Sequence, residues 1–307
     1  MKYTKAVVTG GAGFIGSHLV DALIRRHIKV FVVDDLTAGD KKRLNPNARF
    51  HKLSILSPAL PKLLKTIKPD VIFHLAAQTS VQQSLKDPVG DARVNILGTL
   101  LLARAAAAAK VPKIVFSSTG GALYTGRPPF SETDTIAPAS PYGLSKAGAE
   151  EYLAFAKRQY GLKTTILRYA NVYGPGQTPN GESGVIAIFG KALLAGKSLT
   201  INGDGKQTRD FVYVDDVVRA NLLAMMKDGE GTFNIGTGKE TSMNTIFRLM
   251  TKIVGANVKE KHGPAKDGEV LRSALNVAKA KKELGWESSV SLEEGLAKTI
   301  KWMQKKM

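Results

Sequence analysis

Apolar positions in the first half of the chain fall into short runs separated by longer segments with helical periodicity. Six runs have the length of buried strands, at 6–8, 30–33, 49–53, 71–75, 113–116 and 164–167. The segments between them predict helices from 14 to about 26, and over 58–67, 91–110 and 142–160. Alternating strands and helices with right-handed crossovers predict an α/β fold built on a doubly wound parallel sheet.

The regular alternation stops near residue 170. Glycine and proline cluster over 174–184, and shorter helical and strand signals follow in no fixed order. We expect a dinucleotide-binding domain over 1–170 and a smaller α/β substrate-binding lobe over 171–307. The segment at about 211–236 is expected to return to the first domain.

The first predicted strand ends in a glycine-rich turn. The sequence Thr-Gly-Gly-Ala-Gly-Phe-Ile-Gly occupies 9–16, and the second strand ends at Asp34. A strand, a glycine turn, a helix and a second strand ending in an acid form a dinucleotide-binding unit. The glycines let the backbone approach a pyrophosphate at the positive end of the helix. The turn lacks the Gly-Lys-Ser/Thr ending of an ATP-binding phosphate loop.

The acid that ends the second strand indicates which dinucleotide binds. A carboxylate at Asp34 suits the adenosine ribose hydroxyls and repels a 2′-phosphate, which favours NAD over NADP. Three basic residues at 41–43 follow closely and weaken that preference. A lone glycine turn often only joins a strand to a helix, whereas here the flanking strands and Asp34 agree with a cofactor site.

A hydroxyl, a phenol and an ammonium come together in the middle of the chain. Tyr142 and Lys146 are four residues apart, so a helix places them on one face. A free tyrosine has a pKa near ~10, and a lysine one turn away favours its phenolate. Thr119, just after the predicted strand over 113–116, can hydrogen-bond the substrate hydroxyl whose proton Tyr142 removes. Because Tyr-x-x-x-Lys also occurs on helices without a catalytic role, this interpretation depends on the cofactor site.

Composition narrows the classes of function. Lysine and arginine total 44 against 26 acidic residues, a net charge of +18, and there is no cysteine. The lack of cysteine excludes disulfides and thiolate metal ligands, and we expect no metal site. A basic protein can bind nucleic acid, a membrane surface or an anionic small molecule. The late lysines lack the interleaved aromatic residues of a single-strand platform, so a solvated surface is the simpler interpretation.

No apolar run is long enough to span a membrane or to form a signal peptide, and we expect a cytoplasmic protein.

Further motifs occur in a fixed order along nearly the whole chain. They are the glycine turn at 9–16, His-Leu-Ala-Ala-Gln at 74–78, Asn95, Ser-Ser-Thr-Gly-Gly at 117–121, Tyr142 to Lys146, Arg-Tyr-Ala-Asn-Val-Tyr-Gly-Pro at 168–175, and Gly-Asp-Gly-Lys-Gln-Thr-Arg-Asp-Phe-Val-Tyr-Val-Asp-Asp at 203–216. With them the chain resembles the extended short-chain dehydrogenase/reductase family. Within that family it resembles the nucleotide-sugar epimerases of the UDP-glucose 4-epimerase type.

The resemblance implies an NAD-dependent 4-epimerase of a nucleotide-sugar, UDP-glucose/UDP-galactose first. Tyr142 is then the base at the 4-hydroxyl of the sugar while a hydride leaves carbon 4 for NAD. Lys146 lowers the pKa of Tyr142 and binds the nicotinamide ribose, and Thr119 shares the hydrogen bond to the 4-oxygen. The 4-keto sugar turns over in the pocket and takes the hydride back on its other face, so no net redox change occurs.

Two larger sets of residues match binding positions of the family. The set for NAD is Gly10, Gly13, Phe14, Ile15, Gly16, Asp34, Asp35, Ser54, Ile55, Leu75, Ala76, Ala77, Gln78, Asn95, Ser117, Tyr142, Lys146 and Tyr169. The set for the nucleotide-sugar is Thr119, Tyr142, Asn171, Val185, Gln207, Arg209, Lys266 and Glu269. A bidentate arginine at 209 suits a diphosphate, whereas outside its motif it would be interpreted as a surface ion pair with Asp210 or Asp215.

Four positions depart from the family pattern. Related dehydratases and decarboxylases place an acid just after the hydroxyl, whereas two glycines follow Thr119, which disfavours those reactions. Ser54 stands where many relatives carry an aspartate at the adenine. Lys266 stands where relatives place an arginine on the diphosphate, and lysine loses the fork geometry. Ser273 is small at a position that is bulky in strictly hexose-selective relatives, which indicates that an N-acetylated sugar fits.

Two alternatives stay open. A reductase or dehydrogenase of the same superfamily would release an oxidised or reduced sugar and exchange its cofactor. A remote alternative is a non-catalytic NAD-binding protein that holds nucleic acid on its basic face. It would need a broken catalytic set, whereas Thr119, Tyr142 and Lys146 are all present. The resemblance also implies a homodimer built from the helices over 91–110 and 142–160, with no membrane partner.

Overall fold

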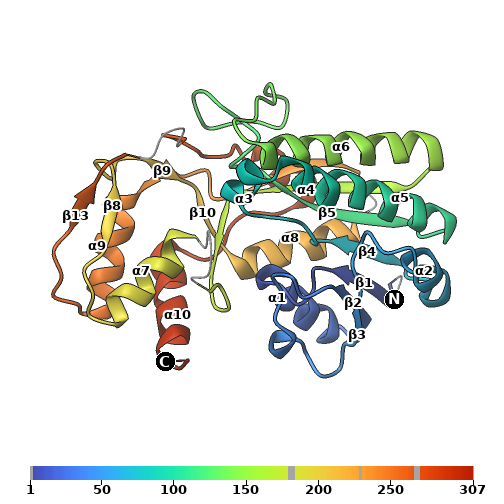
Figure 1. The fold of residues 1–307 in the computed structure, drawn as a ribbon, viewed down its shortest axis with the longest axis horizontal. Helices are drawn as coiled ribbons and strands as arrows, with labels where there is room; N and C mark the ends of the chain where they lie inside the picture. The colour runs from blue at the N-terminus through green and yellow to red at the C-terminus, as the bar shows by residue number, and fades with distance from the viewer. Residues whose placement is uncertain (1–2, 179–183, 228–229, 266–269, 307) are drawn as a thin grey trace.

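A seven-stranded sheet lies at the centre of the larger part of the molecule, with the order β11-β6-β5-β4-β1-β2-β3 (Figure 1). The computed structural model describes residues 3–178, 184–227, 230–265 and 270–306. Every neighbouring pair of strands in this sheet is parallel. The strands are β1 (Lys5–Thr9), β2 (Lys29–Asp34), β3 (Arg49–Lys52), β4 (Val71–His74), β5 (Lys113–Thr119), β6 (Lys163–Tyr169) and β11 (Gly231–Ile235).

Six of these strands coincide with the predicted apolar runs, and β11 is an addition. It lies within the segment at 211–236 and pairs with β6, with Phe233 opposite Leu167. Its sequence, Gly-Thr-Phe-Asn-Ile, has too few consecutive apolar residues to predict a strand. The strands β1, β2 and β4 are buried almost throughout, as expected for a parallel sheet covered on both faces, whereas the edge strand β3 has no fully buried residue.

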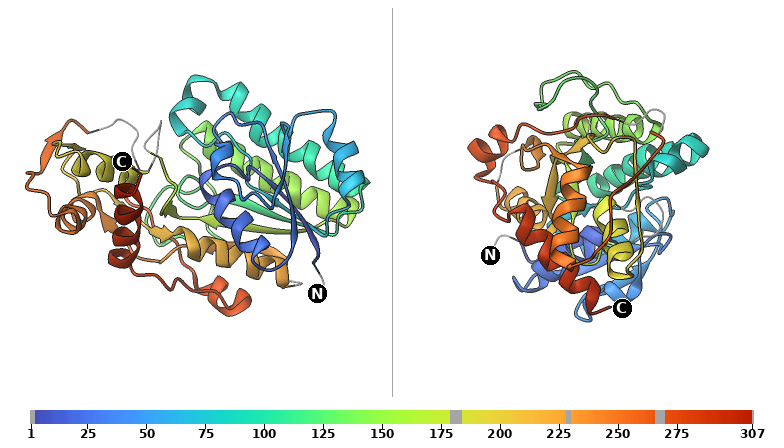
Figure 2. Two further views of the ribbon diagram at one scale, coloured as in Figure 1. Left: turned by 90° about the horizontal axis from the view of Figure 1, so that it is seen from below. Right: turned by 90° about the vertical axis from the view of Figure 1, so that its left-hand side faces the viewer.

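Helices cover both faces of the sheet (Figure 2). Two clusters of buried hydrophobic residues lie between helices and strands. Leu19 and Val217 belong to one cluster, while Leu64, Leu102 and Leu153 belong to the other. The predicted doubly wound architecture is therefore confirmed. The helices are α1 (Phe14–Ile24) and α8 (Val214–Met226) on one face, and α2 (Leu60–Ile67), α5 (Gly98–Ala108) and α6 (Pro141–Tyr160) on the other.

The prediction of one regular α-helix over 91–110 is wrong. The structure has α4 (Pro88–Ala92), a π-helical turn (Arg93–Leu97) and α5 in direct succession, after the short α3 (Val81–Lys86). The flanking residues Ala92 and Gly98 keep right-handed helical dihedrals, so the three pieces form one rod. A π turn holds one more residue than an α turn, and the periodicity of the sequence does not reveal it.

A smaller lobe follows, with its own hydrophobic cluster (Figure 2). Three helices supply most of it: α7 (Val185–Leu194), α9 (Met243–Val254) and α10 (Leu292–Gln304). Short strands pair beside them, β7 (Asn171–Tyr173) with β10 (Phe211–Tyr213), β9 (Thr208–Arg209) with β12 (Thr241–Ser242), and β8 (Thr200–Asn202) with β13 (Lys261–Gly263). The irregular signals after residue 170 correspond to these two- and three-residue strands.

Within the described ranges, none of the helices combines the length and the apolar character needed to cross a membrane.

Candidate active site

The predicted site residues gather at the carboxyl edge of the seven-stranded sheet. Gly10 follows β1, Asp34 ends β2, Leu75 follows β4 and Thr119 ends β5. Tyr169 ends β6. Parallel strands end at the same edge, and this is the edge where ligands bind in open α/β sheets.

The turn after β1 has no room for side chains toward the protein. Gly10 has a φ of +71°, and a Cβ there would lie 2.6 Å from the backbone nitrogen of Ala76. A Cβ on Gly16 would lie 2.2 Å from the Gly10 carbonyl oxygen. A Cβ on Gly13 would meet only that same oxygen, at 3.2 Å. The turn therefore packs tightly against β4 and leaves its outer side open at the start of α1.

The N-terminus of α1 fits the pyrophosphate of a dinucleotide. Gly13 is the N-cap, and no side chain of the described residues caps this helix. The first-turn N–H groups, including those of Phe14 and Ile15, have no intrahelical acceptor and favour an anion. No acidic residue in the first turn opposes one.

Asp34 is held at the end of β2 by two backbone donors. The carboxylate accepts the N–H of Ala12 and the N–H of Leu36, both at 2.9 Å, and is 8% exposed. A carboxylate has about four lone-pair positions, so Asp34 keeps capacity for ribose hydroxyls. Asp35 is exposed and accepts the N–H of Thr37, which turns it into the surface loop.

The remaining residues predicted to contact NAD, at the ends of β3 and β4, differ in burial. Ile55 is 4% exposed and belongs to the hydrophobic cluster under α5, so its side chain serves the core. Ser54 accepts a hydrogen bond from the N–H of Leu56 at 3.3 Å. Leu75, Ala76 and Ala77 are partly exposed in the loop after β4.

Gln78 and Asn95 bind each other where the π turn passes the end of β4. The N–H of Gln78 donates to Asn95 Oδ1 at 2.9 Å, and Asn95 Nδ2 donates to the Gln78 carbonyl at 3.0 Å. Gln78 Nε2 donates to Asp91 Oδ1 at 2.7 Å. Asn95 Nδ2 also donates to Ser145 Oγ on α6 at 3.0 Å. The loop after β4 is thereby tied to the helix that carries Tyr142.

Thr119 and Tyr142 meet at the end of β5, and Lys146 lies one turn after Tyr142 on α6. α6 begins with Ser140 as N-cap, whose Oγ accepts the N–H of Gly143 at 3.2 Å. This cap and Pro141 at the first helical position fix the start of the helix, so that Tyr142 lies in its first turn beside β5. The Thr119 hydroxyl hydrogen-bonds the Tyr142 phenol.

The surroundings of Tyr142 and Lys146 shift both pKa values. Burial raises the pKa of Tyr142 to about 12, the hydrogen bond from Thr119 acts to lower it, and the charge of Asp91 adds to the rise. Burial lowers the pKa of Lys146 to about 8, while Glu150 and Asp91 act to raise it. Without a further positive charge Tyr142 is therefore a neutral phenol at pH 7, beside a lysine that is still mostly protonated.

Lys146 is packed against an aromatic ring. Its Nζ lies 4.1 Å from the centre of the Phe116 ring, and the side chain is buried. A cation over a ring face is stabilised by the quadrupole of the ring. Phe116 on β5 thus fixes the ammonium close to the strand that also carries Thr119.

Glu150, one turn beyond Lys146, forms a buried ion pair with Arg168 of β6. Arg168 contacts both carboxylate oxygens, and its terminal nitrogen lies 2.6 Å from Oε2. Ser118 Oγ donates to Glu150 Oε1 at 2.5 Å, and Arg168 also donates to the Tyr124 hydroxyl. The two charged side chains are 5% and 6% exposed. This cluster fastens α6 to β5 and β6.

His74 lies fully buried behind the site as a neutral ring. Its Nδ1 is 2.8 Å from Thr9 Oγ1, and its Nε2 is 3.0 Å from Thr99 Oγ1. Thr99 donates its proton to the Asn95 carbonyl, so it accepts from Nε2–H, which leaves Nδ1 as acceptor for Thr9. Burial, followed by the charge of Lys146, lowers the pKa of His74 to about 3.

Tyr169 and Ser117 meet at the same edge. The Tyr169 hydroxyl lies 3.0 Å from Ser117 Oγ and accepts from Asn221 Nδ2 at 2.8 Å. Burial raises the pKa of Tyr169 to about 12, with both hydrogen bonds opposing. The phenol is held neutral and positioned by β5 and α8.

Of the predicted nucleotide-sugar residues, Thr119 and Tyr142 lie at the edge of the large sheet, and the other described ones lie on the smaller lobe. Asn171 begins β7, and its N–H donates to the Asp210 carbonyl at 2.8 Å. Val185 is the first residue of α7 and packs against the cluster of that lobe. Lys266 and Glu269 lie outside the described residues.

Gln207 and Arg209 lie on either side of Thr208 around β9. Gln207 Nε2 donates to the Asn202 carbonyl at 2.9 Å, and a terminal nitrogen of Arg209 donates to the Thr208 carbonyl at 2.8 Å. Both side chains are thus held by backbone oxygens.

Several polar side chains of the site were not singled out from the sequence. Asp91 and Glu150 belong here, as do the partners His74 and Tyr124. Asp91 precedes Asn95 by four residues and Glu150 follows Lys146 by four, so helical spacing contains a signal for both. The partners from strands and loops leave no such signal, because their contacts are distant in sequence.

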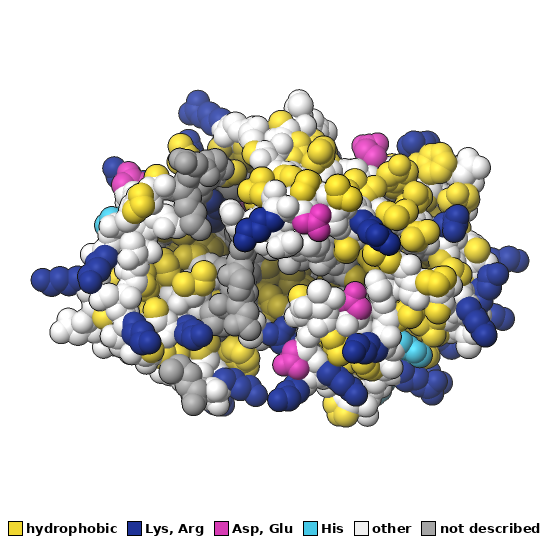
Figure 3. All heavy atoms as spheres, viewed as in Figure 1, with side chains coloured by type: hydrophobic (Ala, Val, Ile, Leu, Met, Phe, Trp, Pro, Cys, Tyr) yellow, Lys and Arg dark blue, Asp and Glu magenta, His cyan; other side chains and the backbone are white. Residues whose placement is uncertain are grey.

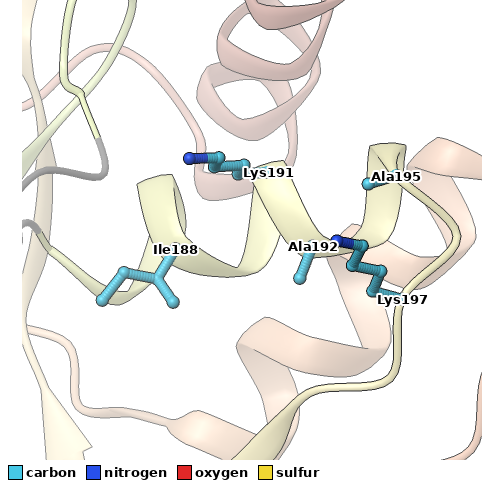
Figure 4. Close-up of a pocket in the computed structure, with 5 residues that line it drawn as sticks. All are labelled: Ile188, Lys191, Ala192, Ala195 and Lys197. Atoms are coloured by element: carbon cyan, nitrogen blue, oxygen red, sulfur yellow. The ribbon is translucent and has the colours of Figure 1, made fainter.

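Two shallow hollows on the surface are lined by none of the predicted site residues. One lies on the outer face of α6, between Tyr152 and Phe155. The other lies on α7 and is lined by Ile188, Lys191, Ala192, Ala195 and Lys197 (Figure 4). On the face of Figure 3, lysine and arginine side chains are scattered over both halves and do not form a single patch.

Comparison with known proteins places this geometry among related enzymes. The model of the NAD dependent epimerase/dehydratase family matches residues 6–236. The UDP-glucose 4-epimerase of Mycolicibacterium smegmatis is 44% identical over 310 residues, covering 98% of this chain and 99% of that protein. The structure of the UDP-glucose 4-epimerase of Thermotoga maritima with UDP-glucose is 48% identical, with a TM-score of 0.97 and 99% of both chains covered. The Thermus thermophilus UDP-glucose 4-epimerase with NAD is 37% identical, with a TM-score of 0.94, covering 99% of this chain and all of that one.

Proposed function

The chain belongs to the NAD dependent epimerase/dehydratase family, and we propose that it interconverts UDP-glucose and UDP-galactose by inverting carbon 4 of the sugar. The observation that carries the proposal is the group formed by Thr119, Tyr142 and Lys146 beside an open glycine turn. The full-length similarity to UDP-glucose 4-epimerases supports the choice of substrate.

NAD, when bound, supplies the acceptor for a hydride from the sugar and the donor that returns it. We propose that the first turn of α1 holds the pyrophosphate, that Asp34 accepts the ribose hydroxyls, and that Lys146 and Tyr169 lie at the nicotinamide end. The glycines at 10, 13 and 16 leave room for this approach.

In this proposal Tyr142 moves the proton. Its phenolate removes the proton of the 4-hydroxyl, and the resulting phenol later gives the proton back to the 4-oxygen. Thr119 holds that oxygen by a hydrogen bond, and the Lys146 ammonium stabilises the phenolate. Because burial raises the pKa of Tyr142 to about 12, ionisation requires the positive charges that surround it in the loaded site.

The residues after Thr119 disfavour a second proton transfer. Two glycines follow it, and a Cβ on Gly120 would lie 2.4 Å from Leu275 Cδ1, so no acidic side chain fits there without a shift. Dehydration and decarboxylation need such an acid, whereas epimerisation needs one base only. A reductase or dehydrogenase would use the same group, and retention of NAD distinguishes it, because net redox chemistry requires the cofactor to exchange.

We propose that residues 1–170, together with the segment at 211–236, bind the cofactor, and that the lobe within 171–307 binds the nucleotide and the diphosphate. Its contacts would be Asn171, Val185, Gln207, Arg209, Lys266 and Glu269. Arg209 supplies the forked donor that suits a diphosphate.

A coupled assay tests the function. Purified protein is given UDP-galactose without added NAD, and the formation of UDP-glucose is followed. Steady production supports epimerisation with a retained cofactor. No product with or without added NAD, together with consumption of added NAD in the presence of a UDP-sugar, would replace the proposal by net redox chemistry.

The substitution Tyr142→Phe tests the role of the phenol. We expect turnover to fall by about 10²–10⁴-fold, the range for loss of a general base, while NAD released on denaturation stays at the wild-type amount. Tyr160→Phe, which removes an exposed phenol at the end of the same helix, is the control and should keep full activity. A Tyr142→Phe protein with near-normal turnover would contradict the role.

A second substrate class is favoured by one feature of the pocket. A Cβ on Gly121 would lie 3.6 Å from Asn171 Oδ1 and 3.9 Å from Ser273 Oγ, so three small or slender residues converge there. We propose that an N-acetylated hexose fits this room. Turnover of UDP-N-acetylglucosamine under the conditions of the coupled assay tests it, and its absence beside turnover of UDP-glucose would refute it.

We further propose a homodimer through the outer faces of α3 to α6. Exposed apolar side chains lie on these elements: Leu85, Val89, Leu97, Leu144, Tyr152 and Phe155. α4 and α6 pack side by side, so their outer faces form one surface. Sedimentation at several protein concentrations tests the dimer, and a monomer at high concentration would rule it out. A cytoplasmic location, where UDP-sugars and NAD are available, is part of the same proposal and is checked by cell fractionation.

A further inference from the structure

Asp91 is a buried carboxylate with one oxygen left over. The side chain lies on α4 and is 1% exposed. Its Oδ1 accepts from Gln78 Nε2 at 2.7 Å and from Asn95 Nδ2 at 3.2 Å. Its Oδ2 is buried and has no hydrogen-bond partner. Leaving a buried carboxylate oxygen without a donor is costly, so a bare Oδ2 calls for a partner that the free chain does not supply.

Titratable groups near Asp91 lie on two elements. α6 packs against α4 and carries Tyr142, Lys146 and Glu150. His74 of β4 is linked through Thr99 to Asn95, which itself donates to Asp91. The electrostatic influence of Asp91 reaches both Tyr142 and Lys146.

Two of these groups are excluded as partners of Oδ2. Both carboxylate oxygens of Glu150 accept hydrogen bonds, from Ser118 and Arg168, and the charge of Arg168 neutralises that of Glu150. Glu150 therefore has no proton to donate to Oδ2. His74 is neutral, and its Nε2–H is directed to Thr99. Lys146 is a buried cation of the described chain that feels the charge of Asp91, and its ammonium lies over the Phe116 ring.

We propose that Asp91 is a positioning residue of the proton-transfer group, which keeps Lys146 charged in the loaded site and accepts its ammonium at Oδ2, directly or through one water. The inference rests on the proposed function, because Lys146 assists Tyr142 only there. Gln78 and Asn95 hold Oδ1 and so orient the free oxygen.

The physical reason is that an ammonium in apolar surroundings loses its proton unless a counter-charge is near. A neutral Lys146 no longer stabilises the phenolate of Tyr142. The same negative charge also opposes ionisation of Tyr142 in the free protein. Asp91 thus keeps Lys146 protonated, and it opposes the ionisation of Tyr142 until the site is loaded.

The substitution Asp91→Asn removes the charge and keeps an acceptor for Gln78. Since Asp91 raises both pKa values, we expect both limbs of the kcat-against-pH profile to move to lower pH, by about one unit. Asp87→Asn is the matched control. It removes the same charge from the N-cap of the same helix, where an asparagine caps equally well, and should leave the profile in place.

A second readout does not need turnover. In the NAD-loaded protein, ultraviolet absorbance titration of Asp91→Asn against Asp91→Asn/Tyr142→Phe isolates the ionisation of Tyr142, and the same pair is compared in the wild-type background. We expect the midpoint to be lower in the Asn variant. If wild-type protein binds NAD but turns over no UDP-sugar, the proposed function fails while this titration still decides the role of Asp91.

Unchanged midpoints and an unchanged pH profile in a folded Asp91→Asn protein would overturn the inference, even if KM or NAD affinity changed. Such a result would leave Asp91 as a structural acceptor for Gln78 only. If Asp91→Asn does not fold, Asp91→Ser, smaller and also neutral, is expected to give the same shift. Asp91→Glu, which keeps the charge, should retain the wild-type profile.

Discussion

The edge of the large sheet and the smaller lobe hold their site residues in different ways. Around α6, side chains bind other side chains in the interior, as Asn95 binds Ser145 and Glu150 binds Arg168. On the smaller lobe, Gln207, just before the two-residue strand β9, binds the backbone oxygen of Asn202. The difference indicates that the side chains around α6, which we call the fixed half, are in place before a ligand binds. The side chains on the smaller lobe, which we call the adaptable half, keep donors that can turn from a backbone oxygen to a ligand.

The connection between the two halves is itself firmly built. Asp210, between β9 and β10, accepts the N–H groups of Thr237, Gly238 and Leu275. Thr237 and Gly238 follow β11, and Leu275 lies in the segment after 270. The buried carboxylate of Asp210 thus joins the lobe to the large sheet. The difference between the two halves therefore lies in how their binding side chains are held, because the lobe as a whole is firmly attached.

The largest effect should follow from breaking the fixed half at Arg168. Arg168→Met leaves the Glu150 carboxylate buried and uncompensated, which we expect to lower the free energy of unfolding by about 3–5 kcal/mol. Denaturant unfolding measures it, and Glu150→Gln/Arg168→Met should recover much of the loss. Lys281→Met breaks an exposed pair with Glu287 and should change stability little. Equal losses in the two single variants would contradict the contrast.

A smaller effect should follow from changing the adaptable half at Arg209. Arg209→Lys keeps the charge but loses the fork, so we expect KM for the UDP-sugar to rise about tenfold with kcat nearly unchanged. NAD content should stay the same, because the fixed half is untouched. Arg272→Lys, at an exposed pair with Glu240, serves as the control. A fall in kcat with constant KM would show that Arg209 acts on the reacting group and not on binding.

The smallest effect concerns the free energy of unfolding at acid pH, to which the buried His74 of the fixed half contributes. Burial holds the pKa of His74 at about 3, below its ordinary 6.5, so between these values the unfolded chain binds a proton that the folded chain does not. Stability contributed by neutral His74 is therefore present above pH 6.5 and is lost as the pH falls toward 3. In His74→Gln the free energy of unfolding should fall less steeply with acid, by at most about 1.4 kcal/mol per pH unit.

Unfolding curves at several pH values measure that slope. His27→Asn, at an exposed position with φ of +59°, is the control and should follow the wild-type slope. Slopes in His74→Gln equal to wild type would mean that the pKa of His74 is the same in the folded and the unfolded protein, which contradicts the prediction.

Much of the fold was predictable because it depends on local patterns. The strands at 6–8 and 30–33 are continuous apolar runs, and the turn at 9–16 needs glycines for its close approach to Ala76. The pairing of Tyr142 with Thr119 was predictable for a related reason, since the strand order of an α/β sheet fixes which ends meet.

The remainder depends on contacts between distant residues. Two pairs form only once the sheet has formed: Glu150 with Arg168, and His74 with Thr99. No pattern in the sequence predicts either pair. β9 and β12 have two residues each, too few for any periodicity. The NAD and nucleotide-sugar residues inferred from the resemblance remain predictions, and Lys266 and Glu269 lie outside the described residues.

The π turn between α4 and α5 has a consequence for anyone who would shorten or idealise this helix. Each residue advances an α-helix by about 100°, so removing one residue from Arg93–Leu97 would restore regular winding and rotate one flank against the other. Either Asn95 would leave Gln78, or the alanine-rich face of α5 would leave the sheet. The wider turn therefore lets the same rod place Asn95 against Gln78 and the alanine-rich face of α5 against the sheet. A regular α-helix of this sequence would lose one of these two contacts.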